Sequence, residues 1–482
     1  MVTRRDFLTV SGLAAANVFL SGAAPKPKGP NILLVFTDQQ TFRAISCAGN
    51  SHLSTPAMDR LAQEGVRFEH AYCTSPVCGP ARASLLTSRM PHETGVEWNG
   101  HSIKADVPHM GHIFRKHGYH TVWAGKWHLP ESYPLRGGSK QKAIDGFDLL
   151  PFYDSSQNYP EWGYGDVTDE PLADAVASFL SRPIEQPFLM GVSFCNPHDC
   201  CYLTRQPKRY PNADQITDPL PPLPPNYTID PNEPEFLREK RAMDHYGDEL
   251  LLSRDWGQTE WQAYLWNYYR MTERVDAALN KVLTALDTHG LSDNTLVLFT
   301  SDHGDGVASH RWTAKLSLYE EATRIPFILR WSQHIPSGRT DTAHLTSQLD
   351  VLPTLCDYVG IPQHPAFRGR SVKTIIDHPN SPWHDTIVTE LADDKRTPSR
   401  KGRMLRSRQY KYNVYSHGKR NEQLFDLKHD PGETQNLAYE PSMYGVVKQH
   451  RTWLRQWIKK TGDTFSGLHL PENSKSGERH CP

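Results

Sequence analysis

Residues 31–39 read NILLVFTDQ, a continuous apolar run that ends in a carboxylate and an amide. An apolar run without polar alternation is typical of a strand buried on both faces, as in a parallel sheet. Residues 188–194 and 295–300 repeat this pattern, and shorter runs at 66–71 and 121–124 predict two further strands. The chain therefore carries the strands of a buried central sheet.

Helical patterns separate these strands. Residues 258–286 form one long pattern, with apolar side chains three, four and seven residues apart. A shorter helix is expected after Thr55-Pro56, where a capping residue and a proline precede a run that Gly65 ends, and residues 109–117 predict another. Strands that alternate with helices predict the α/β class, with a large, mainly parallel central sheet flanked by helices.

The pattern changes past about residue 365. Short strands of an antiparallel sheet are expected at 385–390, 402–408, 410–415 and 422–427, followed by an amphipathic helix at 444–460. We interpret this part as a smaller α+β C-terminal domain. The predicted division is residues 1–28 as a targeting segment with its linker, 29–365 as the main α/β domain and 366–482 as the C-terminal domain.

The N-terminus predicts an export signal. Arg4-Arg5 precede a mildly apolar stretch at 10–20 and small residues at 21–24. The order charged, apolar, small is that of a cleavable signal, and paired arginines are typical of the Tat route. The alternative is a poorly ordered N-terminal helix. We expect a periplasmic or secreted protein without stable membrane insertion, because no later stretch reaches about 18 apolar residues.

Composition narrows the class of partner. The chain has 53 basic and 54 acidic residues, a formal net charge of -1 and no long run of like charge, which argues against a nucleic-acid-binding protein. Its eight cysteines lack the spacing of a zinc ribbon. Cys195, Cys200 and Cys201 can include a disulfide in an oxidising compartment, or can be buried thiols.

Polar side chains follow four of the predicted strands, and such strand ends meet at one edge of a parallel sheet. They are Asp38 and Gln39, Lys126 and His128, His198, and Asp302 and His303. The two carboxylates, the amide oxygen and the imidazole of the first and last pairs predict a site for Ca²⁺, Mg²⁺ or Mn²⁺ rather than a structural Zn²⁺ site.

Cys78 is expected at the start of a helix, because Pro80 suits the first turn of a segment that runs to Thr87. A helix N-terminus favours an anion. The residue type alone leaves open a thiol nucleophile or an inert core cysteine.

The surrounding motifs carry a resemblance. Cys78-Gly79-Pro80-Ala81-Arg82, Gly125-Lys126-Trp127-His128 and Ser301-Asp302-His303-Gly304-Asp305 resemble the type I, formylglycine-dependent sulfatases of the alkaline phosphatase superfamily. Pro197-His198, His310, Lys315 and the segment 319–326 extend the match, which spans most of residues 30–440. The resemblance implies a sulfatase catalytic domain at 29–365 and a sulfuric ester hydrolase activity.

The resemblance also implies a role for each site residue. Cys78 would be oxidised to formylglycine by a maturation enzyme, and its hydrate would be the nucleophile and a metal ligand together with Asp38, Gln39, Asp302 and His303. Arg82 would hold the modified residue, and His128 would be the base that collapses the hydrate. Lys126 and Lys315 would offset sulfate charge, and His198 or Lys315 would protonate the leaving oxygen. His310 is assigned to substrate binding, with a buried structural role as the alternative.

Two departures from the family pattern, at Gln39 and His303, bear on the metal. Gln39 stands where a second acid is common, so the metal site carries less negative charge. Ca²⁺ is our first assignment, and the imidazole of His303 keeps Mn²⁺ open.

We expect a sulfated carbohydrate as substrate. The alternatives are a phosphonate monoester or phosphodiester hydrolase on the same scaffold, and an exported glycan-binding protein with a degenerate site.

Overall fold

The computed structural model describes residues 29–129, 144–150, 164–205, 209–242, 249–392 and 399–468. The predicted export signal at residues 1–28 lies outside them. Among the described residues, no helix combines the length and apolar character that a membrane span requires.

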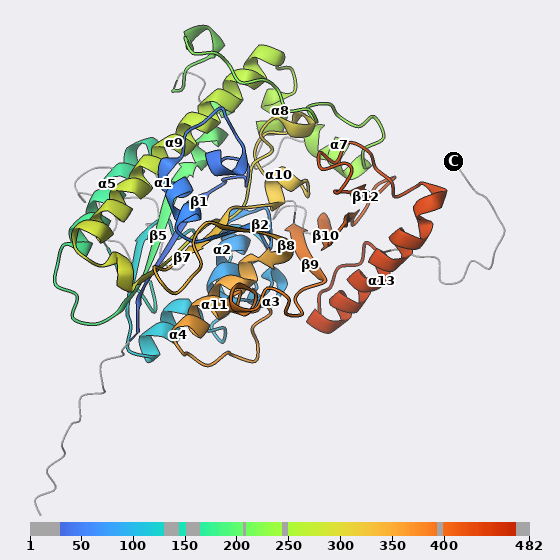
Figure 1. Ribbon diagram of the computed structural model, residues 1–482. Helices are drawn as coiled ribbons and strands as arrows, with labels where there is room; N and C mark the ends of the chain where they lie inside the picture. The colour runs from blue at the N-terminus through green and yellow to red at the C-terminus, as the bar shows by residue number, and fades with distance from the viewer. Residues whose placement is uncertain are drawn as a thin grey trace, which may run out of the picture.

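An eight-stranded sheet forms the centre of the molecule (Figure 1). Its order is β4 (Asp148–Leu149), β3 (His120–Gly125), β5 (Phe188–Pro197), β1 (Asn31–Asp38), β6 (Thr295–Ser301), β7 (Phe327–Arg330), β2 (Val66–Tyr72) and β8 (Arg339–Ser347). Only β7 runs antiparallel to its two neighbours; the other pairs are parallel. The mainly parallel sheet predicted from the apolar runs is confirmed.

Both faces of the sheet are covered, which explains why β1 is apolar without alternation. Ile32, Leu34 and Phe36 face one core, where helices α2 (Cys78–Thr87), α4 (Met110–Lys116) and α11 (Val351–Tyr358) pack. Leu33 and Val35 face the other core, under α1 (Pro56–Gln63), α5 (Gly165–Leu180) and α9 (Gln258–Thr288). Figure 1 shows α1, α5 and α9 on one side of the sheet and α4 and α11 on the other.

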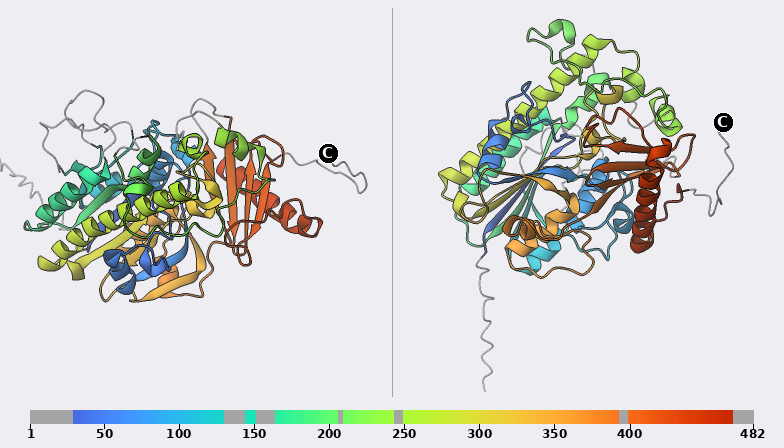
Figure 2. Two further views of the ribbon diagram at one scale, coloured as in Figure 1. Left: turned by 90° about the horizontal axis from the view of Figure 1, so that it is seen from above. Right: turned by 45° about the vertical axis from the view of Figure 1, so that its right-hand side comes forward.

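A second, four-stranded antiparallel sheet lies beside the first (Figure 2). It comprises β9 (Thr386–Ala392), β10 (Lys401–Ser407), β11 (Tyr410–Tyr415) and β12 (Glu422–Asp426), in the order β12-β11-β10-β9. Helix α13 (Tyr444–Thr461) covers one face through Val447 and Leu454. The other face packs on Tyr72 and Trp312 of the main part. The predicted small α+β unit is confirmed, while its boundary at residue 365 stays a prediction.

Two elements differ from the sequence-based expectation. No element was predicted at residues 165–180, where the structure has helix α5. Its apolar face, which includes Leu172 and Val176, starts only after Pro171, so the first turns carry no helical pattern. The antiparallel strand β7 was also missed, because four buried residues cannot be assigned from periodicity.

Candidate active site

The carboxyl ends of β1 and β6 bring two acids together in the protein interior. Asp38 is the last residue of β1, and Asp302 directly follows β6; both side chains are fully buried. The two strands are parallel neighbours, with Thr37 paired to Ser301, so the predicted meeting of these acids is a consequence of register.

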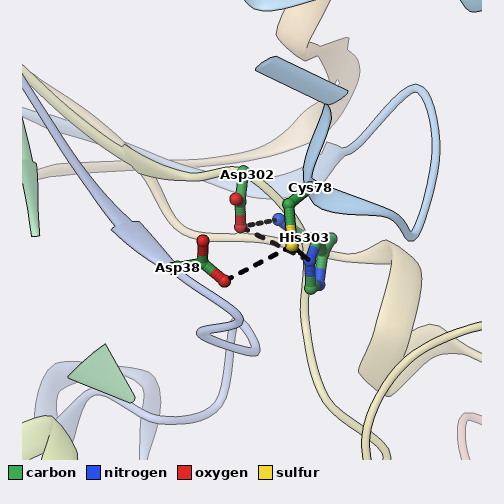
Figure 3. Close-up of side chains that lie close together, drawn as sticks. All are labelled: Asp38, Cys78, Asp302 and His303. Carbon is green, nitrogen blue, oxygen red and sulfur yellow. Dashed lines mark hydrogen bonds and ion pairs between the residues drawn. The ribbon is translucent and has the colours of Figure 1, made fainter. Parts of the chain in front are cut away.

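Cys78 is the first residue of α2, and Figure 3 shows its side chain beside those of Asp38, Asp302 and His303. Its Sγ is 3.1 Å from His303 Nε2 and 3.6 Å from Asp38 Oδ1. Lys315 Nζ donates to the same sulfur at 3.1 Å. Burial and the charge of Asp38 by themselves would raise the pKa of the Cys78 thiol, but Lys315, His303 and Lys126 together lower it.

Arg82 lies one turn after Cys78 on the same helix and bridges the two acids. Its Nη2 donates to Asp38 Oδ2 at 2.8 Å, and its Nε donates to Asp302 Oδ2 at 2.9 Å. The guanidinium is 1% exposed, and its remaining donors reach the Lys126 carbonyl and the Ser193 hydroxyl. A planar guanidinium carries five N–H donors in a fixed fork, which suits a bridge between two carboxylates.

Two lysines add positive charge around Cys78. Lys126 Nζ is 2.7 Å from Asp38 Oδ2. Gly125 allows this placement: its φ is +89°, and a Cβ there would meet the Ser193 carbonyl at 2.2 Å. Burial alone would raise the pKa of Asp38, but Lys126 and the other nearby cations hold it well below its usual value. The site therefore combines ionised carboxylates with an excess of cationic donors, as anion binding requires.

The two histidines predicted for proton transfer lie in the same electrostatic environment. Burial first, and then the charge of Lys126, lowers the pKa of both His128 and His198 well below the usual value. Both rings are therefore neutral at pH 7, so each has a lone pair that can accept a proton.

The site fits a divalent cation. The ligand atoms of Asp38, Cys78, Asp302 and His303 all lie within 4.8 Å of one another, and all four residues are buried. Two carboxylates and an imidazole provide the charge and the donor atoms for such an ion. Arg82 holds Oδ2 of each carboxylate, and Oδ1 of Asp38 is 3.6 Å from the Cys78 sulfur.

The comparisons with known proteins agree with this geometry. The family model described as Sulfatase matches residues 30–361. This chain belongs to the sulfatase family. A model of the C-terminal part of N-sulphoglucosamine sulphohydrolase matches residues 308–460 of the sulfatase. The enzyme is a sulfuric ester hydrolase of the alkaline phosphatase superfamily, as its motifs predicted.

Individual relatives are similar over almost the whole sulfatase. A Delta 4,5-hexuronate-2-O-sulfatase of Bacteroides thetaiotaomicron is 31% identical over 474 residues, which cover 95% of each chain. A solved 2-O GAG sulfatase structure has a TM-score of 0.80 at 29% identity and covers 92% of this chain and 95% of that one. A phosphonate monoester hydrolase of Agrobacterium radiobacter shares the fold, with a TM-score of 0.70 at 22% identity, over 90% of this chain and 96% of that one.

The side chain of Gln39 is held by protein groups on both of its ends. Its Oε1 accepts a hydrogen bond from Lys315 Nζ at 3.0 Å, and its Nε2 donates to Asp305 Oδ2 at 2.8 Å. Its backbone N–H donates to Asp302 Oδ1 at 3.0 Å. The assignment of Gln39 as a metal ligand stays a prediction, and the structure adds a second role for it, which is to position Lys315 and Asp302.

Several residues of the sulfatase site have a left-handed backbone that non-glycine residues rarely adopt. The φ angles of Gln39, His128 and Leu316 are 69°, 60° and 69°. Such conformations persist where surrounding contacts determine them, and they cluster at active sites. Gln39 follows the end of β1, His128 is the predicted base, and Leu316 is next to Lys315.

His310 has its contacts in another group of residues. Its ring stacks on Tyr319 with 3.8 Å between ring centres, and its Nε2 is 3.4 Å from Asn226 Nδ2. It is 3% exposed. Burial mainly lowers its pKa to about 3. Its substrate-binding role stays a prediction, and these contacts favour the structural alternative.

The structure also adds groups that the sequence reasoning missed. Asp305 holds both Gln39 and the hydroxyl of Tyr264, the latter at 2.6 Å, and Asn99 Oδ1 accepts from the Gly79 N–H at 2.7 Å beside Cys78. Asp305 is part of the motif Ser301-Asp302-His303-Gly304-Asp305, and that motif was the signal that could have identified it. No sequence signal points to Asn99. The described cysteines, including Cys195, Cys200 and Cys201, are not in disulfides.

Proposed function

We propose that this enzyme is an exported sulfatase that hydrolyses sulfate esters of carbohydrates, with formylglycine formed from Cys78 and a bound Ca²⁺. The observation that carries the proposal is the position of Cys78. Cys78 is the first residue of α2, and its sulfur is in contact with His303 and Lys315 and close to Asp38.

The proposed chemistry needs two oxygens on the side chain of residue 78. Oxidised and hydrated, this residue supplies two hydroxyl groups on one carbon: one attacks sulfur as the alcohol leaves, and the other loses its proton as sulfate is expelled and the aldehyde returns. A bound divalent ion would polarise the sulfate oxygens and the attacking hydroxyl.

The surrounding residues handle charge and protons. Lys126 and Lys315 offset the negative charge that develops on the sulfate oxygens. His128 is neutral and accepts the proton of the second hydroxyl. The leaving oxygen takes its proton from Lys315, or from His198 once this ring, neutral in the resting enzyme, has accepted a proton. Substrates with good leaving groups need no such proton, so loss of the true acid should slow alkyl sulfates far more than aryl sulfates.

Removal of the metal is expected to abolish turnover. Asp38 and Asp302 would then face Arg82 and Lys126 alone, and the substrate sulfate would lose its strongest cationic partner. Chelator treatment followed by dialysis should lower the rate at least ~10³-fold, and Ca²⁺ should restore it more fully than Mg²⁺ or Mn²⁺. Full activity in the chelated, metal-analysed enzyme would contradict the proposed centre, and full recovery only with Mn²⁺ would change the ion.

Names of relatives support a carbohydrate substrate. The relatives include an N-acetylglucosamine-6-O-sulfatase of Bacteroides thetaiotaomicron and an ulvan-active sulfatase of Formosa agariphila, besides the hexuronate sulfatase. A panel of defined sulfated mono- and oligosaccharides, compared with choline sulfate, tests the class. We expect kcat/KM at least ~10²-fold higher for one sulfated sugar, because sugar contacts add binding energy in the transition state. Equal rates for all sulfate esters would contradict a carbohydrate enzyme.

A second candidate function is hydrolysis of phosphonate monoesters. The pairs Asp38-Gln39 and Asp302-His303 favour it, together with the shared fold of the phosphonate monoester hydrolase. Turnover of an aryl sulfate and of an aryl phosphonate monoester by the same preparation separates the two functions. A higher kcat/KM for the phosphonate would replace the sulfatase proposal.

Export through the Tat route rests on Arg4-Arg5 and the stretch that follows. The test is a fusion of residues 1–28 to a reporter that is active only after export in the folded state. Replacement of both arginines by lysine keeps the charge and should abolish export, whereas replacement of Lys26 and Lys28 by arginine should not. Export by the lysine pair would contradict the Tat assignment.

A further inference from the structure

A second group of metal-ligating side chains lies at the end of β5, apart from the four residues around Cys78. Cys195 is near the end of the strand, and His198 and Asp199 open the short 3₁₀ helix that follows, His198–Cys201. Their ligand atoms all lie within 4.8 Å of one another. None of the three belongs to the first group.

Two of these side chains have polar atoms that no described residue satisfies. Asp199 is fully buried; its Oδ2 accepts from the Asp166 N–H at 3.1 Å, and its Oδ1 has no hydrogen-bond partner among the described residues, although the Tyr210 hydroxyl lies close to the carboxylate. Nδ1 of His198 is likewise buried without a partner in the described part of the chain. A buried carboxylate oxygen and a buried ring nitrogen are costly to leave unpaired, and their coincidence beside a cysteine indicates a ligand that the described residues do not supply.

We propose that Cys195, His198 and Asp199 form a Zn²⁺ site whose occupation inhibits the enzyme. One sulfur, one nitrogen and one oxygen are donors that Zn²⁺ accepts in tetrahedral sites, with a fourth position for water. The first group, with two carboxylates, suits a harder ion. As the Zn–S bond forms, the Cys195 thiol releases its proton to solvent, so the thiolate and Asp199 balance both charges of the ion.

Charge and access are compatible with this site. Lys126 is close enough to Cys195 and His198 to affect both electrostatically, and its charge opposes a cation. Asp169 and Asp199 act on Cys195 with the opposite sign and favour a cation there. His198 is partly exposed although its two partners are buried, so solvent reaches the group at the histidine.

Zinc would inhibit the enzyme because one of its ligands, His198, also acts in the proposed reaction. The proposed function gives His198 a part in protonating the leaving oxygen, and a ring whose Nδ1 is bound to zinc cannot carry the extra proton that this part requires. This consequence rests on the proposed function, whereas the binding itself does not. The two are therefore measured separately.

Binding is tested with Co²⁺, whose bond to a thiolate gives a near-ultraviolet charge-transfer band. The full-length Cys78→Ser variant is used, because it removes the thiol of the first group. We expect one equivalent of Co²⁺ to produce the band and Zn²⁺ to abolish it by displacement. The band should be lost in Cys78→Ser/Cys195→Ser. In Cys78→Ser/Asp199→Asn, the affinity for Co²⁺ should fall at least ~10-fold.

The matched control is Cys78→Ser/Cys47→Ser. Cys47 is a half-buried thiol near the carboxylate of Asp59, and it belongs to none of the metal-ligating groups found among the described residues. This variant should keep the band. A band that persists without Cys195, or no band in Cys78→Ser, would overturn the site. Asp199→Asn keeps the shape of the side chain, so it gives an answer even if Cys195→Ser folds poorly.

Inhibition is tested with the active enzyme in excess Ca²⁺, so that zinc does not act by replacing the first ion. Each form is compared with its own zinc-free rate of aryl sulfate or alkyl sulfate hydrolysis. We expect Cys195→Ser to need at least ~10-fold more Zn²⁺ for half inhibition than the parent. Equal sensitivity of the two enzymes would overturn the inhibitory role, even if the cobalt band maps to Cys195.

Discussion

The Cys78→Ser variant is expected to fold normally and to lose multiple turnover. Serine has one hydroxyl, so after attack on sulfur its ester has no second hydroxyl whose proton loss could expel sulfate. The steady-state rate should fall at least ~10³-fold, as expected when the reacting group is removed. At most one equivalent of alcohol should be released per enzyme, which a burst measurement detects, and intact mass should show one added SO₃ group.

The matched variant is Cys78→Ala, which has no hydroxyl and should give neither a burst nor the added mass. Unfolding midpoints of the two variants should be close to each other, because both residues are small and Cys78 contributes little apolar volume. Sustained turnover by the serine variant would contradict the proposed chemistry. Peptide mass analysis of the parent, in turn, should show position 78 as the aldehyde; an active enzyme with an intact thiol would also contradict it.

Arg82→Met is expected to have the largest effect on stability. Arg82 joins Asp38 and Asp302 by hydrogen bonds of 2.8 and 2.9 Å, and all three side chains are at most 1% exposed. Loss of one partner from a buried ion network leaves uncompensated charge and costs about 3–5 kcal/mol. Urea unfolding of the chelated enzyme should therefore show a lower free energy of unfolding by about this amount.

The control for Arg82 is Arg82→Lys, which keeps the charge but not the fork. Lys126 already neutralises Asp38, so the lysine variant should recover part of the stability but little of the activity. A free energy of unfolding for Arg82→Met within about 0.5 kcal/mol of the parent would show that the network contributes nothing to stability.

Much of this molecule was predictable because the signals are local. The apolar runs of β1, β5 and β6 need no partner to be recognised, since burial on both faces removes polar residues from the strand itself. The long helix α9 follows from the spacing of side chains along it. The approximate meeting of Asp38 and Asp302 followed as well, since parallel strands bring their carboxyl ends to one edge.

The expectations that failed or stayed open depend on contacts between distant parts of the chain. Helix α5 begins before its apolar pattern does, and β7 is too short for a period to appear. The direction of the Gln39 side chain is set by a left-handed backbone and by Lys315 and Asp305, which are more than 260 residues away. No spacing rule can report such a partner.

The sequence by itself determined the α/β class, the small C-terminal sheet, the sulfatase motifs and the residues at the strand ends, because each is encoded in adjacent or regularly spaced residues. Tertiary structure alone decided that Arg82 bridges two acids and that His310 stacks on Tyr319. It also decided that Cys195, His198 and Asp199 share one small volume with two atoms that no described residue satisfies. Distances, burial and hydrogen-bond partners arise only when separate segments pack together, and these quantities determine the chemistry at the end of the sheet.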